Sequence, residues 1–172
     1  MLRVCVEALF VIITFVLQST MFQAMSLANV TPNVMIMLVS IFGFIRGKKE
    51  GLFLGFFSGL LVDIFYGDIL GFYAFVYMII GYLNGFFHSR YYKEEIFLPM
   101  GLVIGSDALY GIFMYIFRFA LRNRSSFGYN FIHIIIPEIV YTLVVTIVFY
   151  RIILVVNRKL EKIEKRSASK FG

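Results

Sequence analysis

The side chains that most often carry enzyme chemistry are few and scattered in this chain. The single cysteine, Cys5, cannot form an internal disulfide, and the two histidines, His88 and His133, are far from it and from each other in sequence. The sequence holds no HExxH motif, no GxSxG motif and no glycine-rich loop leading to a lysine. Catalysis needs a nucleophile, a base or a metal at workable geometry. We therefore predict a protein that is not an enzyme and that holds neither a metal nor a cofactor.

Ion pairing is the chemistry that the remaining charged residues favour. Three acidic residues lie within or beside long apolar segments, and three arginines follow one of these segments: Asp63, Asp107, Glu138, Arg118, Arg122 and Arg124. A charge near the middle of a bilayer costs about 2.5 to 3.5 kcal/mol on insertion scales, so such groups are expected to be paired or neutralised. The sequence predicts an ion-pair cluster in the outer half of the membrane. Pairs that only lock helices together are the favoured interpretation, and a site for a partner's polar segment is the alternative.

The composition identifies the chain as an integral membrane protein. Hydrophobic residues make up 60% of the 172 residues and charged residues 15%, against about 45 to 50% and about 25% in soluble domains. At about 20 residues per membrane-spanning helix, the length allows six spans and no separate soluble domain. The predicted fold class is an all-α bundle of six transmembrane helices.

The six predicted spans form one domain, residues 1–157, followed by a basic tail, residues 158–172. The spans are placed at residues 4–20, 34–45, 51–65, 72–87, 96–117 and 131–156. The second is too short for a bilayer core of about 30 Å, so it begins either near Leu27 or below the outer surface, beneath a re-entrant loop. Thr31 or Asn29 is expected to cap it, with Pro32 in its first turn. Pro137 predicts a kink in the last span.

The distribution of basic residues predicts the orientation. If both termini are cytoplasmic, 13 of the 16 lysines and arginines lie inside, and the exceptions are Arg118, Arg122 and Arg124; this follows the positive-inside rule. The tail can then bind the anionic inner leaflet, at about 1 kcal/mol per basic residue. Glu7, in the first turns of the first span, is expected to extend toward the headgroups, with a buried functional role as the alternative.

A ridge of small residues runs along the third span. Gly51, Gly55 and Gly59 recur at every fourth position, and Asp63 holds the next place in the same phase. Residues four apart share one face of a helix, and small residues allow helix backbones to approach closely in lipid. We predict a helix-docking ridge at Gly51, Gly55, Gly59 and Asp63. The fourth span carries Ala74, Met78, Gly81 and Gly85 on one face, and this face is the expected mate of the ridge.

Two further glycines, Gly67 and Gly71, follow this ridge. They are predicted to be turn residues that allow positive φ.

The order of these features resembles the rod shape-determining protein MreD family. The resemblance is carried by Pro32-Asn33, the basic turn Arg46-Gly47-Lys48, the ridge glycines with Leu60-Leu61-Val62-Asp63, and Gly67, Gly71 and Gly81-Tyr82-Leu83. It implies a multi-pass protein of the bacterial inner membrane, with no catalytic residues to carry over. It also implies the partners: the bitopic protein MreC, the wall-synthesis enzymes of the cell-elongation complex and the lipid bilayer, without nucleic acid.

Two function classes remain beside an enzyme. A non-catalytic scaffold of the elongation machinery needs only a docking face. The alternative is a substrate-binding subunit of a vitamin or other small-molecule transporter, because six short helices with an outer loop also resemble those subunits of energy-coupling-factor transporters. These subunits usually dock through small residues on the first helix, where this chain has Val4, Ala8, Ile12 and Val16. The sequence favours the scaffold.

Overall fold

The structure is a computed structural model that describes residues 2–24, 31–67, 69–90, 96–122 and 135–168. These residues form helices joined by turns, without a strand. The helices in chain order are α1 (Leu2–Ser19), α2 (Met21–Ala24), α3 (Val34–Arg46), α4 (Lys48–Tyr66), α5 (Phe72–Gly85), a 3-10 helix η1 (Phe86–Arg90), α6 (Phe97–Arg122) and α8 (Ile136–Ala168). The predicted all-α class is confirmed.

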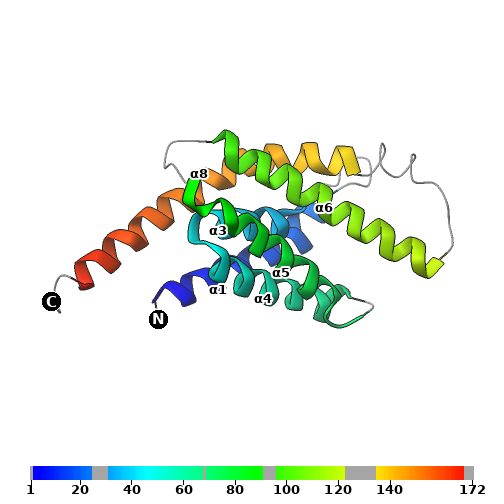
Figure 1. Cartoon of the computed structure of the whole chain (residues 1–172), viewed down its shortest axis with the longest axis horizontal. Helices are drawn as coiled ribbons and strands as arrows, with labels where there is room; N and C mark the ends of the chain where they lie inside the picture. Colours follow the sequence, from blue (N-terminus) through cyan, green and yellow to red (C-terminus); the bar gives the residue numbers. More distant parts are fainter. Residues whose placement is uncertain (1, 25–30, 68, 91–95, 123–134, 169–172) are drawn as a thin grey trace.

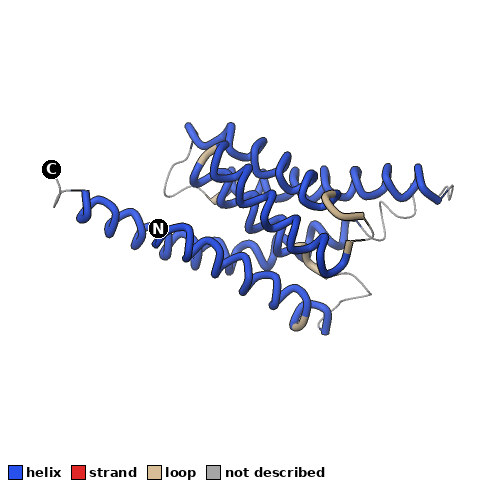
Figure 2. Tube along the Cα trace, turned by 90° about the horizontal axis from the view of Figure 1, so that it is seen from below, coloured by secondary structure: helices blue, strands red, loops and turns tan. Residues whose placement is uncertain are grey.

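The long helices run back and forth along one axis of the molecule. Figure 1 shows the start of α1, the turn between α3 and α4, and the end of α8 at the same end, with the turn between α4 and α5 at the other. In Figures 1 and 2 the C-terminal part of α8 projects beyond the rest of the bundle.

Helix α3 is the centre of the bundle. All residues from Val34 to Ile45 are buried, and α3 packs against α1, α4, α5, α6 and α8. Its 13 residues rise by only about 20 Å. A helix this short and this apolar stays inside a membrane protein only when other helices cover both its sides and its ends.

Three side chains from different parts of the chain cover the amino end of α3. Asn33 is the N-cap, its Oδ1 accepting from the Ile36 N–H at 3.3 Å. Gln18 Oε1 accepts from the Met35 N–H at 2.8 Å, and Thr142 Oγ1 accepts from the Asn33 N–H at 3.0 Å. These bonds satisfy donors that a helix start leaves open. Helix α3 therefore begins at Val34 and not near Leu27, and its first donors are satisfied within the bundle.

The predicted caps of α3 were wrong. Asn33 takes the place expected for Thr31 or Asn29, and Pro32 precedes the helix instead of entering its first turn. Asn29 itself lies outside the described residues. Asn33 is the N-cap because its side chain accepts a hydrogen bond from the backbone N–H of Ile36, three residues later. This is the usual hydrogen bond of an N-cap residue.

Two glycines adopt positive φ at the turns. Gly47, between α3 and α4, has φ of 99°, and Gly71, before α5, has φ of 97°. The prediction for Gly71 is confirmed. Gly67 has φ of −80°, so the prediction of positive φ there was wrong. It closes α4 in extended conformation, its N–H donating to the Asp63 carbonyl oxygen at 3.0 Å.

The last two helices differ from the predicted spans. Helix α6 continues to Arg122, so Arg118 and Arg122 lie in its final turns instead of in a loop. Among the described residues α8 begins at Ile136, with Pro137 in its first turn, where a missing N–H costs nothing. Residues 131–134, the start of the predicted span, lie outside the described residues, so the predicted kink stays a prediction. The basic tail continues α8 as helix to Ala168.

Within the described residues, two helices are long and apolar enough to cross a membrane by themselves. They are residues Phe97–Phe117 of α6 and Ile136–Leu160 of α8. Two shorter apolar helices are Val4–Ser19 and Val34–Arg46.

Candidate functional site

The glycine ridge of α4 lies directly against the backbone of α5. A Cβ at Gly55 would overlap the Tyr77 carbonyl group, and a Cβ at Gly59 would lie 2.5 Å from the Ala74 Cα. Real Cβ atoms do not approach backbone this closely, so neither position accepts any side chain without separating the helices. The mate of the ridge is the helix whose small residues the sequence singled out.

The contacts between α4 and α5 follow a regular antiparallel register. Gly51 meets Gly81, Gly55 meets Tyr77 and Gly59 meets Tyr73 and Ala74, so each step of four along α4 matches a step of four back along α5. Beyond Gly51, Gly85 packs on the backbone of Gly47 and Lys48. The ridge is thus buried against α5 of the same chain.

Three glycines from three helices meet at one point of this contact. A Cβ on Gly51 would lie 2.7 Å from the Gly43 Cα and would overlap the Gly81 carbonyl oxygen, and Gly43 also faces Gly81. At this point helices α3, α4 and α5 therefore approach one another closely enough for their backbones to touch. They form a closed three-helix unit.

Asp63 ends the ridge by capping α5. Its Oδ1 accepts from the Tyr73 N–H at 2.9 Å and its Oδ2 from the Ala74 N–H at 2.8 Å. The side chain is buried, with 2% of the residue exposed. A carboxylate at a helix N-terminus satisfies open donors and interacts favourably with the helix dipole. Asp63 shares the phase of the glycines because it too faces α5.

The predicted ion-pair cluster of Asp63, Asp107, Glu138 and the three arginines is only partly within the described residues. Asp63 has backbone partners. Asp107 of α6 is 2% exposed, and neither of its carboxylate oxygens has a hydrogen-bond partner among the described residues. Glu138 lies in the first turn of α8. The side chains of Arg118 and Arg122, and Arg124 altogether, lie outside the described residues.

A buried hydrogen bond joins α5 to α6. Asn84 Nδ2 donates to Ser106 Oγ at 2.8 Å, and Ser106 Oγ donates to its own helix at the Leu102 carbonyl oxygen. Both residues are largely buried. Sequence reasoning missed this pair, although an asparagine within an apolar segment is a signal that it needs a partner.

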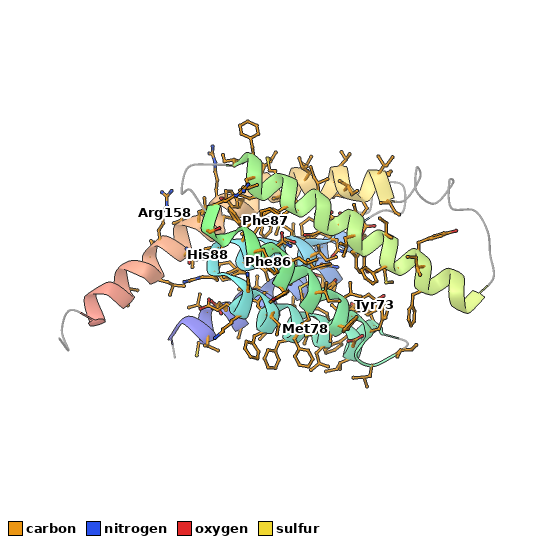
Figure 3. The ribbon with its side chains drawn as sticks, viewed as in Figure 1. Tyr73, Met78, Phe86, Phe87, His88 and Arg158 are labelled. Carbon is orange, nitrogen blue, oxygen red and sulfur yellow. The ribbon has the colours of Figure 1, made fainter. Side chains whose placement is uncertain are left out.

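The end of α3 is fixed by residues that follow α5. Figure 3 labels Phe86, Phe87 and His88 at the end of the bundle where α8 leaves it, and Tyr73 toward the opposite end. His88 Nδ1 donates to the Phe44 carbonyl oxygen at 3.1 Å, and Lys48 Nζ lies 3.6 Å from the centre of the Phe86 ring. The histidine thus has a structural partner at the α3 terminus.

An ion pair links α1 to α3 at the same end. Arg46 Nε lies 3.9 Å from Glu7 Oε1, and the side chains are 4% and 15% exposed. The expectation that Glu7 extends toward headgroups was wrong, because the nearby guanidinium holds it in the bundle. The sequence analysis placed Glu7 and Arg46 near the same, cytoplasmic side of the membrane. That common depth is the sequence feature from which the pair could have been predicted.

Two hollows of different kind lie beside α1. One, of about 580 Å³, is an apolar groove between α1 and α4. The other, of about 170 Å³, is lined by Phe15, Gln18, Ser19, Thr31, Val62, Tyr66, Tyr73, Tyr77 and Tyr110. In contrast to the closed ridge, Gly101 and Gly105 of α6 face open space, with nothing within 4 Å of a Cβ at either position.

The comparisons with known proteins give one match. The family model for the rod shape-determining protein MreD matches residues 1–160. No curated protein and no solved structure matches the chain.

Proposed function

The chain belongs to the MreD family of rod shape-determining proteins, and on this premise we propose that it is a non-catalytic scaffold of the cell-elongation machinery. It holds an MreC-like bitopic protein and the wall-synthesis enzymes together. The observation that carries the proposal is the family match over residues 1–160, which includes α1 to α6 and most of α8.

The side chains best suited to chemistry have structural tasks, which supports a scaffold. Asp63 caps α5, His88 binds the end of α3, and Glu7 pairs with Arg46. Each task fixes one helix against another. A protein whose polar groups are used in this way offers a rigid surface for partners.

We also propose six membrane spans with both termini in the cytoplasm of a bacterial inner-membrane protein. The α6 and α8 spans, the 13 basic residues assigned to one side and the alternating course of the helices support this topology. The short α3 crosses as the covered centre of the bundle. The basic end of α8, residues 158–168, extends from the membrane as helix, and an arginine of the outer side would neutralise Asp107.

The carrier alternative receives less support. Small-molecule sites usually have volumes of about 300 to 1,000 Å³ and hold a few converging polar groups. The tyrosine-lined hollow measures only about 170 Å³. The groove between α1 and α4, of about 580 Å³, has the usual volume, but Glu7 and Glu50 are its only polar lining side chains within the described residues. The first helix presents only Ala8 as a small residue in its series of four. Helix α1 therefore lacks the row of small residues through which energy-coupling-factor subunits usually dock.

Depletion in the bacterium that encodes the protein tests the proposal. We expect depleted cells to become round or wide, with normal vitamin uptake, and a plasmid copy to restore the rod shape. Cells that keep their shape but grow only with one added vitamin would replace the scaffold with the carrier.

A further inference from the structure

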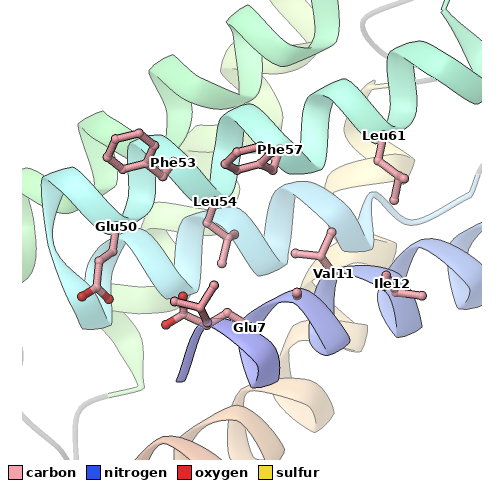
Figure 4. Close-up of a pocket in the computed structure, with 10 residues that line it drawn as sticks. Glu7, Val11, Ile12, Glu50, Phe53, Leu54, Phe57 and Leu61 are labelled. Atoms are coloured by element: carbon pink, nitrogen blue, oxygen red, sulfur yellow. The ribbon is translucent and has the colours of Figure 1, made fainter. Parts of the chain in front are cut away.

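The tyrosine-lined hollow differs in chemistry from the groove between α1 and α4. Figure 4 shows that groove with largely apolar walls, in which Glu7 and Glu50 are the polar side chains among the described residues. The wall of the hollow instead combines aromatic rings with the polar side chains of Gln18, Ser19 and Thr31. Its volume of about 170 Å³ admits one small polar group or a few water molecules, since a water needs about 30 Å³.

Three of the lining tyrosines form one cluster. Tyr73 and Tyr77 of α5 and Tyr110 of α6 make three ring pairs, with ring centres 6.4, 6.4 and 6.0 Å apart. The rings meet tilted or edge to face, so none is stacked flat on another. The face of an aromatic ring is electrically negative and attracts a cation within about 6 Å of the ring centre. Such a cluster beside a small hollow therefore suits a positively charged group.

A buried carboxylate lies next to this cluster. Asp107 precedes Tyr110 by three residues on α6, so the two share a face of the helix, and Asp107 is 2% exposed. Neither of its carboxylate oxygens has a hydrogen-bond partner among the described residues. A charge at this depth in a membrane protein is expected to be paired. The described residues therefore leave Asp107 in need of a positive partner.

A series of polar contacts connects Asp107 to the wall of the hollow. The Tyr77 hydroxyl donates to Asn33 Oδ1 at 3.5 Å, and the Asn33 N–H donates to Thr142 Oγ1 at 3.0 Å. Thr142 lies beside the Asp107 carboxylate, without a hydrogen bond of ordinary geometry. The charge of Asp107 also acts directly on Tyr77. A charged group against the Tyr77 ring would therefore interact with Asp107.

The charges around the hollow disfavour an anion. Asp63 and Glu138 also act electrostatically on Tyr77, and no lysine, arginine or histidine among the described residues lines the hollow. An anionic group would therefore meet like charge. A neutral group would leave the charge of Asp107 uncompensated. A cation is attracted both by the carboxylates and by the ring faces.

We propose that the tyrosine-lined hollow binds one guanidinium or ammonium group, against the rings of Tyr73, Tyr77 and Tyr110 and near the charge of Asp107. Two sources carry this chemistry. One is the set of three arginines that the sequence places on the outer side of the same chain, and the other is a cation from outside the chain, such as a basic side chain of a partner. The site does not depend on the scaffold function, because it follows from a cavity, a ring cluster and an unpaired carboxylate.

Titration of the full-length protein in mild detergent with small cations tests the site. The chain has 11 tyrosines and no tryptophan, so tyrosine fluorescence reports on a ligand that contacts the cluster. Ethylguanidinium and ethylammonium should produce a saturable change. The neutral analogue ethylurea should bind at least about tenfold more weakly, because it lacks the charge that the rings and the carboxylate attract. Equal binding of ethylurea would overturn the proposal.

Matched substitutions test the two parts of the site. Asp107→Asn removes the charge at nearly constant size and should weaken cation binding about tenfold, whereas Glu50→Gln, near the start of α4, should change it by less than about twofold because distant charges are screened. Tyr110→Phe keeps the ring and should bind like the wild-type protein, whereas Tyr110→Leu should weaken binding about tenfold. Equal effects within either pair, at equal yields of monodisperse protein, would overturn the proposal.

A triple substitution identifies the source of the cation. A hollow that is already filled by an arginine of the same chain would give no change in the titration of the wild-type protein. The variant with Arg118→Gln, Arg122→Gln and Arg124→Gln should then bind the probes. Binding to the wild-type protein instead assigns the site to a cation from outside the chain. Absence of binding in both proteins would overturn the site, and the effect of depletion on cell shape would still decide the scaffold function.

Discussion

Asp63 Oδ2 accepts a hydrogen bond of 2.8 Å from the backbone N–H of Ala74, in the first turn of α5. The ridge of α4 thus ends in a side chain that captures the helix lying along it. Glycines bring the two backbones together, and the carboxylate fixes how far one helix can slide along the other. This combination makes α4 and α5 a rigid pair on which the surfaces for partners depend.

The first prediction concerns this carboxylate. Asp63→Asn replaces one acceptor oxygen with a donor that faces a backbone N–H, so we expect a loss of about 1 to 3 kcal/mol in the free energy of unfolding. Titration from mild detergent into SDS measures it. Asp68→Asn is the control; a silent Asp63→Asn beside a harmful Asp68→Asn would contradict the capping role.

The second prediction uses one substitution at two glycines. Gly55→Ala places a methyl group on the Tyr77 carbonyl group, and we expect it to cost about 1 to 3 kcal/mol, as overpacking does. Gly105→Ala enters open space and should change the free energy of unfolding by less than about 0.5 kcal/mol. Equal effects at both sites would show that the ridge is not a tight contact.

The third prediction concerns the hydrogen bond between Asn84 and Ser106. A double-mutant cycle with Asn84→Ala and Ser106→Ala should give a coupling energy near 0.6 kcal/mol, the average for such bonds between membrane helices. The cycle is measured by the same SDS titration. Additive effects within error would mean that the bond does not stabilise the α5–α6 contact.

Sequence analysis predicted the structure best where the contact between two helices follows from a regular spacing of residues. A period of four keeps residues on one helical face, so Gly51, Gly55 and Gly59 identified both the ridge and its mate on α5. Asp63 was correctly assigned to that face, but its partner was not. A carboxylate is satisfied equally by an arginine or by two backbone N–H groups, and only the distance between helices decides which is present.

The missed features depend on contacts between distant parts of the chain. Asn33 is bonded to Thr142, 109 residues away, and Glu7 lies beside Arg46. No periodic pattern encodes such pairs, because they result from how five helices, α1, α4, α5, α6 and α8, converge on the short α3. The groove between α1 and α4 was equally beyond sequence reasoning, since it depends on the tilt of α1.

The fourth prediction is topological. Reporter fusions after Lys170 should be active only as cytoplasmic reporters, because most basic residues lie on that side under the positive-inside rule. Fusions in the segments near Asn29 and Arg124 should report the outer side. Periplasmic activity after Lys170 would contradict the six-span arrangement.

Affinity purification from native membranes, with identification of the recovered proteins, tests the scaffold function most directly. The tagged protein should recover an MreC-like single-pass protein and wall-synthesis enzymes, and Gly55→Leu, which separates α4 from α5, should abolish this recovery, whereas Phe56→Leu should not. Recovery of transporter ATPase subunits in place of these partners would contradict the account.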